Sequence, residues 1–71
     1  MTIQPGTRVE VLNGRGELSE RVAVTGVVQG RDFPVVHVAR VDDYRDALAK
    51  GRAPEGTPWP AEDVHPLAAP A

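Results

Sequence analysis

The stretch that decides the fold runs from Val22 to Val41 and reads VAVTGVV (22–28), QGRDFP (29–34) and VVHVARV (35–41). Two runs rich in β-branched residues flank a turn segment with glycine, aspartate and proline, which is the pattern of an antiparallel hairpin. Gly26 interrupts the first run, and a glycine inside a strand often marks a bulge or a bend. The stretch therefore predicts a bent central hairpin, which a small barrel needs where one strand belongs to both half-sheets.

Counting apolar residues does not decide which face of this hairpin is the more apolar one. In the second arm, Val35, His37 and Ala39 alternate with Val36, Val38 and Arg40. Both alternating sets are largely apolar, so we expect both faces to be mostly covered, as in the centre of a small barrel.

Length and composition limit the possible functions. A chain of 71 residues forms one domain with a small core, which a partner or a second copy would help to complete. It has no cysteine, so no disulfide or zinc–thiolate site is available. The net charge of −2 and the pI of about 5.5 disfavour indiscriminate binding to phosphate backbones, although a local basic patch is compatible with them.

The expected location is the cytoplasm, without membrane contact. The N-terminus has no basic segment followed by a long apolar run, as a signal peptide would. Nor does any apolar run approach the roughly 18 residues that a membrane helix needs. Within the chain, we expect a flexible segment at 1–5, one barrel domain over 6–67 and a disordered tail at 68–71.

The segment before the hairpin predicts one strand and one turn. Residues 7–12 alternate, with Val9 and Val11 on the same face. The pair Asn13-Gly14 is a strong turn signal, because both residue types tolerate positive φ. Two interpretations remain open: a tight hairpin at this pair, or a longer loop over 13–20 with Leu18 tucked beneath it. The longer loop is preferred.

After the hairpin the period changes and predicts a short helix over about 42–50. Asp42 is the expected N-cap and Gly51 the expected C′ residue. The proline- and glycine-rich segment 53–60 excludes a helix or a central strand. A single 3₁₀ turn over 61–64 and a short edge strand over 64–67 are expected to follow.

This order of elements resembles an SH3-like barrel. The segment PGTRVEVLNG (5–14) looks like the first strand and turn of Tudor-like, Agenet-like and KOW-type members, and WPAEDVHP (59–66) looks like their closing turn and strand. Residues 51–64 are also similar to the C-terminal half of small uncharacterised proteins from GC-rich bacteria. The resemblance implies a mainly β fold: an SH3-like small barrel of four to five antiparallel strands, with one short helix before the last strand.

The ligand motifs of these families are missing from the chain. No Ala-Leu-Tyr-Asp-Tyr type motif is present, and three aromatic residues, Phe33, Tyr44 and Trp59, are too few for a methyl-ammonium cage. KOW-type nucleic-acid binders usually carry several lysines in the first loop, where this chain has Arg15 alone. The resemblance therefore supports the architecture and none of the familiar ligands.

Catalytic and metal-binding patterns are also missing. His37 and His65 have no histidine partner at ligand spacing, although Glu62 and Asp63 lie nearby in sequence. Ser19 is the only serine and does not stand in a recognisable nucleophile turn. We therefore expect no catalytic residues, no metal and no cofactor, and not an enzyme.

The sequence favours a non-catalytic adaptor module that acts by protein–protein contact. The predicted surface consists of Tyr44, Leu48 and Trp59 with nearby loop residues, because Tyr44 and Leu48 share a helix face and Trp is favoured at interface centres. Trp59 also has a structural interpretation, which is the preferred one, in which it packs over the open end of the barrel. The partner is either another protein or a second copy, bound through edge strands or through the helix.

The alternative function is association with nucleic acid, in transcription or in a mobile element. Arg8, Arg21 and Arg40 would form a basic stripe if they projected from neighbouring strands on one face. Acidic residues are interleaved with them, however, and solvated strand faces with weak cross-strand ion pairs are the preferred explanation of the pattern.

Overall fold

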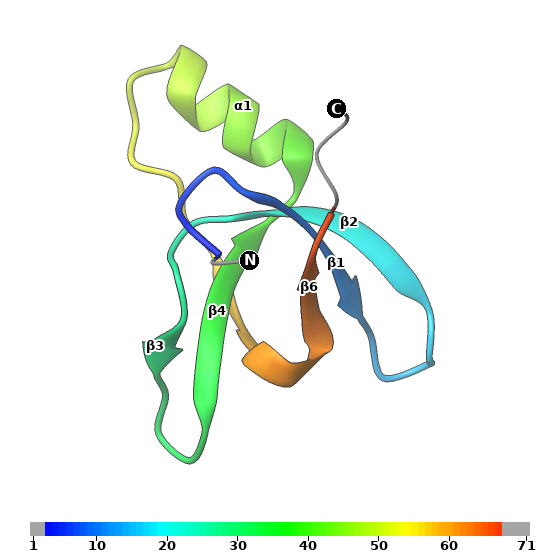
Figure 1. Ribbon diagram of the computed structural model, residues 1–71. Coiled ribbons are helices and arrows are strands. Elements are labelled where there is room, and N and C mark those ends of the chain that lie inside the picture. Colours follow the sequence, from blue (N-terminus) through cyan, green and yellow to red (C-terminus); the bar gives the residue numbers. More distant parts are fainter. Residues whose placement is uncertain (1–2, 68–71) are drawn as a thin grey trace.

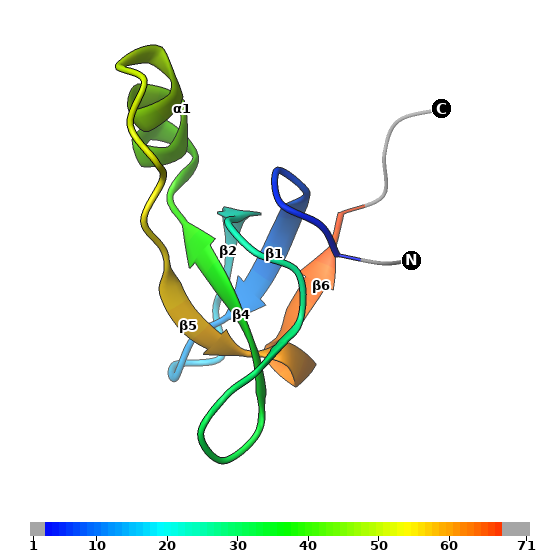
Figure 2. The ribbon, with the colours of Figure 1, turned by 90° about the vertical axis from the view of Figure 1, so that its left-hand side faces the viewer.

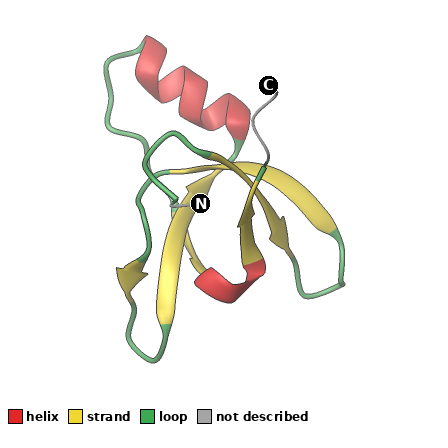
Figure 3. Ribbon diagram, viewed as in Figure 1, coloured by secondary structure: helices red, strands yellow, loops and turns green. Residues whose placement is uncertain are grey.

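The computed structural model describes residues 3–67, which form a curled antiparallel sheet with one α-helix and one 3₁₀ helix (Figures 1 and 3). The elements, in chain order, are β1 (Arg8–Leu12), β2 (Leu18–Ala23), β3 (Val28–Gln29), β4 (Pro34–Ala39), α1 (Val41–Ala49), β5 (Thr57–Pro60), η1 (Ala61–Asp63) and β6 (Val64–Pro66). The expectations for residues 1–2 and 68–71 lie outside the described residues.

The strands form a half-barrel that is compatible with the SH3-like plan. Their order is β3-β4-β2-β1-β6, and β5 pairs with β4 as well. Because η1 carries the chain from β5 to β6, it connects the two ends of the curled sheet (Figure 1). The mainly β class and the helix are thus confirmed. Residues 3–67 contain six strands rather than four or five, since the first arm of the hairpin is divided and β5 forms a separate strand.

The predicted central hairpin is confirmed, with a break in its first arm. β2 pairs with the end of β4, where Val22 lies opposite Ala39, and β3 pairs with its beginning, where Val28 lies opposite Val35. Between them the chain bends over residues 24–27. The hydroxyl of Thr25 there accepts a hydrogen bond of 3.2 Å from a backbone N–H of β4. One arm therefore serves two parts of the sheet.

Gly26 permits this bend because another segment passes close to it. A Cβ at Gly26 would lie 2.9 Å from the carbonyl oxygen of Ile3. Ile3 is 9% exposed and belongs to the core cluster. The side chain of Ile3 therefore closes the core beside the bend.

The change Gly26→Ala is expected to lower the free energy of unfolding by about 1–3 kcal/mol, because the added methyl group must displace the backbone at Ile3. Urea unfolding followed by circular dichroism measures the loss. The matched control is Gly14→Ala, where φ is not positive and a Cβ would meet no atom within 4 Å. This control is expected to change the stability by less than about 0.5 kcal/mol. Equal effects of the two changes would contradict the steric role of Gly26.

The core lies on the concave, inner face of the sheet. Its buried cluster consists of Ile3, Val9, Val11, Ala23, Val36, Val38 and Val64, with Trp59 and Ala61 packed against it. Val9 and Val11 are fully buried, which confirms that they share the inner face of β1. Because side chains alternate along a strand, their neighbours on β1 point to the outer face.

The turn between β1 and β2 is shorter than the preferred interpretation of the sequence. Leu12 pairs with Leu18, so β2 begins where the longer loop was expected to continue, and Leu18 is 57% exposed rather than tucked in. The reason is the side chain of Asn13, whose Oδ1 accepts hydrogen bonds from the N–H groups of Arg15 and Glu17 at 2.8 and 2.9 Å. These bonds close a five-residue turn.

Helix α1 packs against the outer side of β2, near the 4% exposed Val22 (Figure 1). The N-cap predicted at Asp42 is wrong: the extended backbone ends at Arg40, so Asp42 already lies in the first helical turn. Gly51, with φ of +69°, ends the helix as expected. With nine residues α1 is too short to cross a bilayer, and no other helix within residues 3–67 could do so.

The free edge of β5 carries two prolines. The carbonyl of His37 accepts a hydrogen bond from the N–H of Val24, so the backbone groups of His37 face the β2–β3 connection. Because backbone groups alternate in direction along a strand, those of Val36 face β5, where they pair with Trp59. Pro58 and Pro60 then direct their nitrogen atoms outward, where they have no N–H to offer.

The free edge of β6 is closed in a similar way. The N–H of Leu67 donates to the carbonyl of Arg8 on β1, so the backbone groups at alternate positions, Val64 and Pro66, face the free edge. The N–H of Val64 is used there, because it donates to the carbonyl of Ala61. Pro66, between Val64 and Leu67, has no N–H. Neither edge therefore presents a row of free donors to an added strand.

Candidate protein-binding surface

An uncovered apolar surface lies on the outer side of β3, β4 and β5. We call it the outer apolar face and define it by Val28, Phe33, Val35, Pro58 and Pro60. Strand partners directly opposite each other share a face, and the register aligns Val28, Val35 and Pro60 in one row. Three of the five residues, Val28, Phe33 and Pro58, are exposed, and the other two are half-buried.

Alternation along β4 and β5 produces this face. Val36 is fully buried on the inner side, so Val35 and His37 point outward. On β5, Trp59 packs against the core, so Pro58 and Pro60 on either side of it must point outward as well. The inward orientation of one aromatic residue thus directs two proline rings towards solvent.

Phe33 stands at the end of this face, in the turn between β3 and β4. The turn is closed by a hydrogen bond of 3.1 Å from the N–H of Gly30 to the carbonyl of Phe33. A Cβ at Gly30 would collide with that same carbonyl oxygen, so only glycine fits there. The turn holds the ring of Phe33 with 48% of its surface exposed.

Two hollows flank the ring of Phe33. One, of about 350 Å³, extends over Val35, His37, Pro58 and Pro60. The other, of about 250 Å³, lies towards η1 and is lined by Pro34, Pro60, Ala61 and Glu62. The outer apolar face therefore combines a projecting aromatic ring with concave apolar surface on both sides of it.

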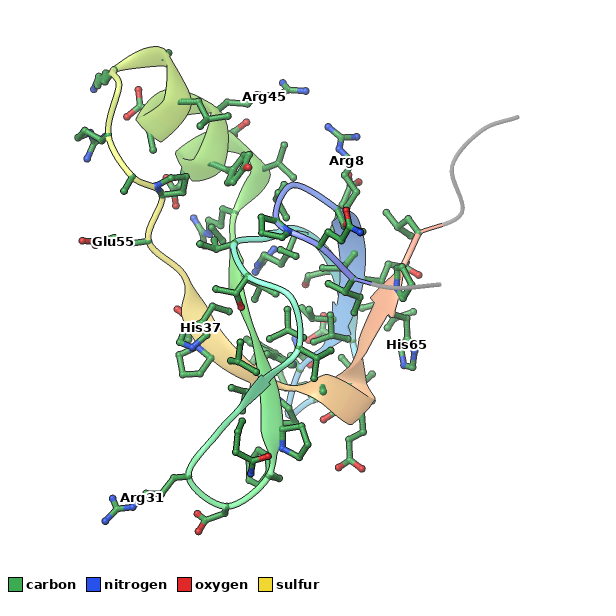
Figure 4. The ribbon with its side chains drawn as sticks, turned by 60° about the vertical axis from the view of Figure 1, so that its left-hand side comes forward. Arg8, Arg31, His37, Arg45, Glu55 and His65 are labelled. Atoms are coloured by element: carbon green, nitrogen blue, oxygen red, sulfur yellow. The ribbon has the colours of Figure 1, made fainter. Side chains whose placement is uncertain are left out.

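Charged residues lie at the edge of this face. Arg31 and Asp32 both line the larger hollow, and Figure 4 shows Arg31 at the tip of the β3–β4 turn. Among residues 3–67, neither takes part in an ion pair. The turn lies at the end of the molecule opposite α1, as Figures 1 and 2 show, so the helix does not cover this part of the surface.

Trp59, one of the residues predicted to form the binding surface, packs into the fold. Its side chain lies against the core cluster, and its indole N–H donates a hydrogen bond of 3.0 Å to the carbonyl of Leu12. Of the two open interpretations, the structure supports packing at the end of the barrel. The bond also ties β5 to the far end of β1.

The other two predicted residues lie on α1, and the structure does not gather all three into one patch. The hydroxyl of Tyr44 lies beside Gly6, before β1 begins, whereas Trp59 is bonded to Leu12 at the end of β1. An extended segment of this length separates the two points by roughly 20 Å. Leu48 is 56% exposed on the helix surface.

The three arginines predicted to form a basic stripe do not share a face. Arg8 lies on the outer side of β1 and pairs with Glu20 at 3.1 Å. Arg21 lies opposite Val9 and therefore on the inner side. Arg40 is the N-cap of α1. The condition for a stripe, that the arginines project from one face, is not met by the two strand arginines, because the register places Arg8 and Arg21 on opposite faces.

Arg21 and Arg40 do meet in a hollow of about 260 Å³ beside Trp59, but two carboxylates, Asp43 and Glu55, line the same hollow. Its charge is therefore mixed rather than basic. A surface that binds phosphate through electrostatics needs an excess of cations, which this hollow does not supply.

The two histidines lie far from each other. Figure 4 shows His37 beside β5 and His65 beside β6, on opposite sides of the molecule. Within residues 3–67, no group of three or more acidic, histidine or cysteine side chains is arranged to hold a metal ion.

The surface predicted from the sequence did not include Phe33, Pro58 or Pro60. The signal that could have found the two prolines is their spacing, two residues apart on either side of an aromatic residue. If that aromatic residue packs inward, strand alternation turns both prolines outward.

Known proteins offer no direct guide to the function of this chain. A scan against protein-family models gave no match, and searches of curated proteins and of solved structures gave none either. The function is therefore inferred from the outer apolar face.

Proposed function

We propose that this chain is a non-catalytic binding module that contacts a protein partner through its outer apolar face. One observation carries the proposal: Val28, Val35 and Pro60 form an uncovered row, with the ring of Phe33 projecting beside it. Apolar surface that is contiguous rather than scattered marks interaction sites in soluble proteins.

The residues of this face suit a binding role energetically. Proline loses little side-chain entropy when it is ordered at an interface, and aromatic rings contribute the largest apolar contact area. Both hollows beside Phe33 can receive side chains from a partner. A partner that fills them removes apolar surface from water at little conformational cost.

The finer resemblance to Tudor-like, Agenet-like and KOW-type barrels belongs to this proposal. It supports a binding module rather than an enzyme, although the contact surface here differs from the ligand motifs of those families. Protein contact is favoured over nucleic acid, because Arg8 is paired with Glu20 and the hollow of Arg21 and Arg40 has mixed charge.

The change Phe33→Asp is expected to reduce the amount of partner captured from nuclease-treated lysate by tenfold or more, on the order of a hot-spot loss. Its matched control is Leu48→Asp, which places the same charge at a similarly exposed apolar position on α1: the two side chains are 48% and 56% exposed. The control is expected to capture as much partner as the unchanged chain. Thermal unfolding verifies that both variants are folded.

Two other outcomes would contradict the proposal. If Leu48→Asp abolished capture and Phe33→Asp did not, the helix surface around Tyr44 and Leu48 would be the binding site. If capture required nucleic acid and was lost in Arg21→Ala and Arg40→Ala, the nucleic-acid function would replace protein contact.

A further inference from the structure

We propose that the occupant of the outer apolar face is a second copy of this chain, docked face to face about a two-fold axis. This inference deepens the proposed function and rests on it, because it names the partner of the same surface. Shape, charge and the blocked sheet edges all support it.

The shape of the face is self-complementary. Phe33 projects, and the hollow beside it has a volume of about 350 Å³. An apolar cavity of about 150 Å³ is enough to hold a benzene ring, so the hollow can admit a phenyl side chain. In a two-fold dimer, each copy inserts Phe33 into the hollow of the other, and both rings lose contact with water in one step.

The charges at the edge of the face also match a second copy. Arg31 and Asp32 are adjacent in sequence, carry opposite charges and line the same hollow. Neither is in an ion pair within the described part of the chain. A two-fold axis beside this turn brings Arg31 of one copy towards Asp32 of the other and repeats the contact on the opposite side. Two identical faces therefore do not repel each other.

Prolines at the edges of β5 and β6 disfavour another route to a dimer, the pairing of edge strands. Pairing through β5 would need N–H groups where Pro58 and Pro60 have none, and Pro66 interrupts the free edge of β6. Association through β5 or β6, which the sequence left open, is therefore disfavoured, and the terminal strand β3 has only two residues. Docking through the face needs no backbone donors.

The expected dimer is weak. A standard interface covers about 800 Å² on each partner. That is about a sixth of the solvent-accessible surface of this protein, which is 5065 Å². The outer apolar face consists of five side chains, so it lies at the low end of interface size. We expect a dissociation constant on the order of 10–100 µM.

Sedimentation velocity over about 5 µM to 1 mM tests the dimer, because this range spans the expected constant. The expected mass rises with concentration from 7.6 kDa to twice that value. Phe33→Asp is expected to remain monomeric throughout the range, whereas Leu48→Asp, the matched control on α1, dimerises like the unchanged chain.

A charge exchange tests the two-fold arrangement itself. Arg31→Asp and Asp32→Arg each place like charges across the axis and are expected to weaken the dimer about fivefold or more. The double variant Arg31→Asp/Asp32→Arg restores opposite charges and is expected to recover most of the affinity. A double variant that is weaker than both single variants would overturn the two-fold contact.

The remaining outcomes separate the dimer from the proposed function. A monomer at all concentrations overturns the dimer. If Phe33→Asp nevertheless reduces capture of a different protein, the binding function of the face stands without it. If the chain is monomeric and Phe33→Asp changes no capture, both proposals fail. A dimer that Leu48→Asp disrupts and Phe33→Asp does not would place the interface on α1 and overturn this one.

Discussion

Replacing Trp59 by alanine is expected to lower the free energy of unfolding by about 3 kcal/mol, the low end of the range for aromatic residues. The indole packs against the core cluster and donates its N–H to the carbonyl of Leu12. The loss is large for this chain, because a domain of 71 residues has a total stability of about 4–10 kcal/mol. Urea unfolding followed by far-ultraviolet circular dichroism measures it without relying on the fluorescence of the residue that is removed.

The variant Trp59→Phe separates packing from hydrogen bonding. It keeps a smaller aromatic ring against the core and loses the bond to Leu12, so about 1–2 kcal/mol should be lost. Partner capture by Trp59→Phe should equal that of the unchanged chain. Should Trp59→Ala keep full stability and lose capture instead, Trp59 would be a binding hot spot and its packing role would be wrong.

The second large effect is expected at Val36, which is fully buried in the centre of β4. The change Val36→Ala removes two methyl groups and leaves a cavity between rigid strands, so it should cost about 2–3 kcal/mol. The chain supplies its own matched control at Val28, which is 39% exposed on β3. Val28→Ala should cost less than about 1 kcal/mol by urea unfolding.

The same two variants should also differ in their effect on binding. Val28 belongs to the outer apolar face and Val36 does not, so Val28→Ala should weaken self-association or partner capture. Val36→Ala, measured below its unfolding temperature, should leave both nearly unchanged. A Val28→Ala protein that bound as well as the unchanged chain would remove the row of Val28, Val35 and Pro60 from the contact surface.

The central hairpin was predictable because its signals are local. β-branched runs, a turn rich in glycine and proline, and Gly26 within a strand all act over a few residues. The helix, its end at Gly51 and the 3₁₀ turn at 61–63 were predictable for the same reason. The N-cap at Asp42 was missed by two positions, since the point where β4 stops being extended depends on its pairing with β2.

The binding surface was harder to predict, because it depends on register. Arg8 and Arg21 look equivalent in sequence, but the five-residue turn closed by Asn13 pairs Arg8 with Val22 and Arg21 with Val9. A shift of one residue reverses the face of every side chain on a strand. The sequence leaves that shift open, because it allows both a tight hairpin at Asn13-Gly14 and a longer loop over 13–20.

The outer apolar face has a similar origin. Val35 and Val36 are identical residues, and only the curvature of the sheet decides that Val36 is buried and Val35 half-buried. Likewise, proline looks like a loop residue in the sequence, yet Pro58 and Pro60 stand in a strand. They remain compatible with it because their nitrogen atoms point away from β4.

The prolines at the sheet edges have a consequence for growth into fibrils. An ordered aggregate extends by adding strands, and each new strand needs backbone donors on the exposed edge. Pro58 and Pro60 remove them from β5, and Pro66 interrupts those of β6. The edges of β5 and β6 therefore offer no template for an added strand, and a fibril that grew from the folded chain would have to begin at β3, a terminal strand of only two residues.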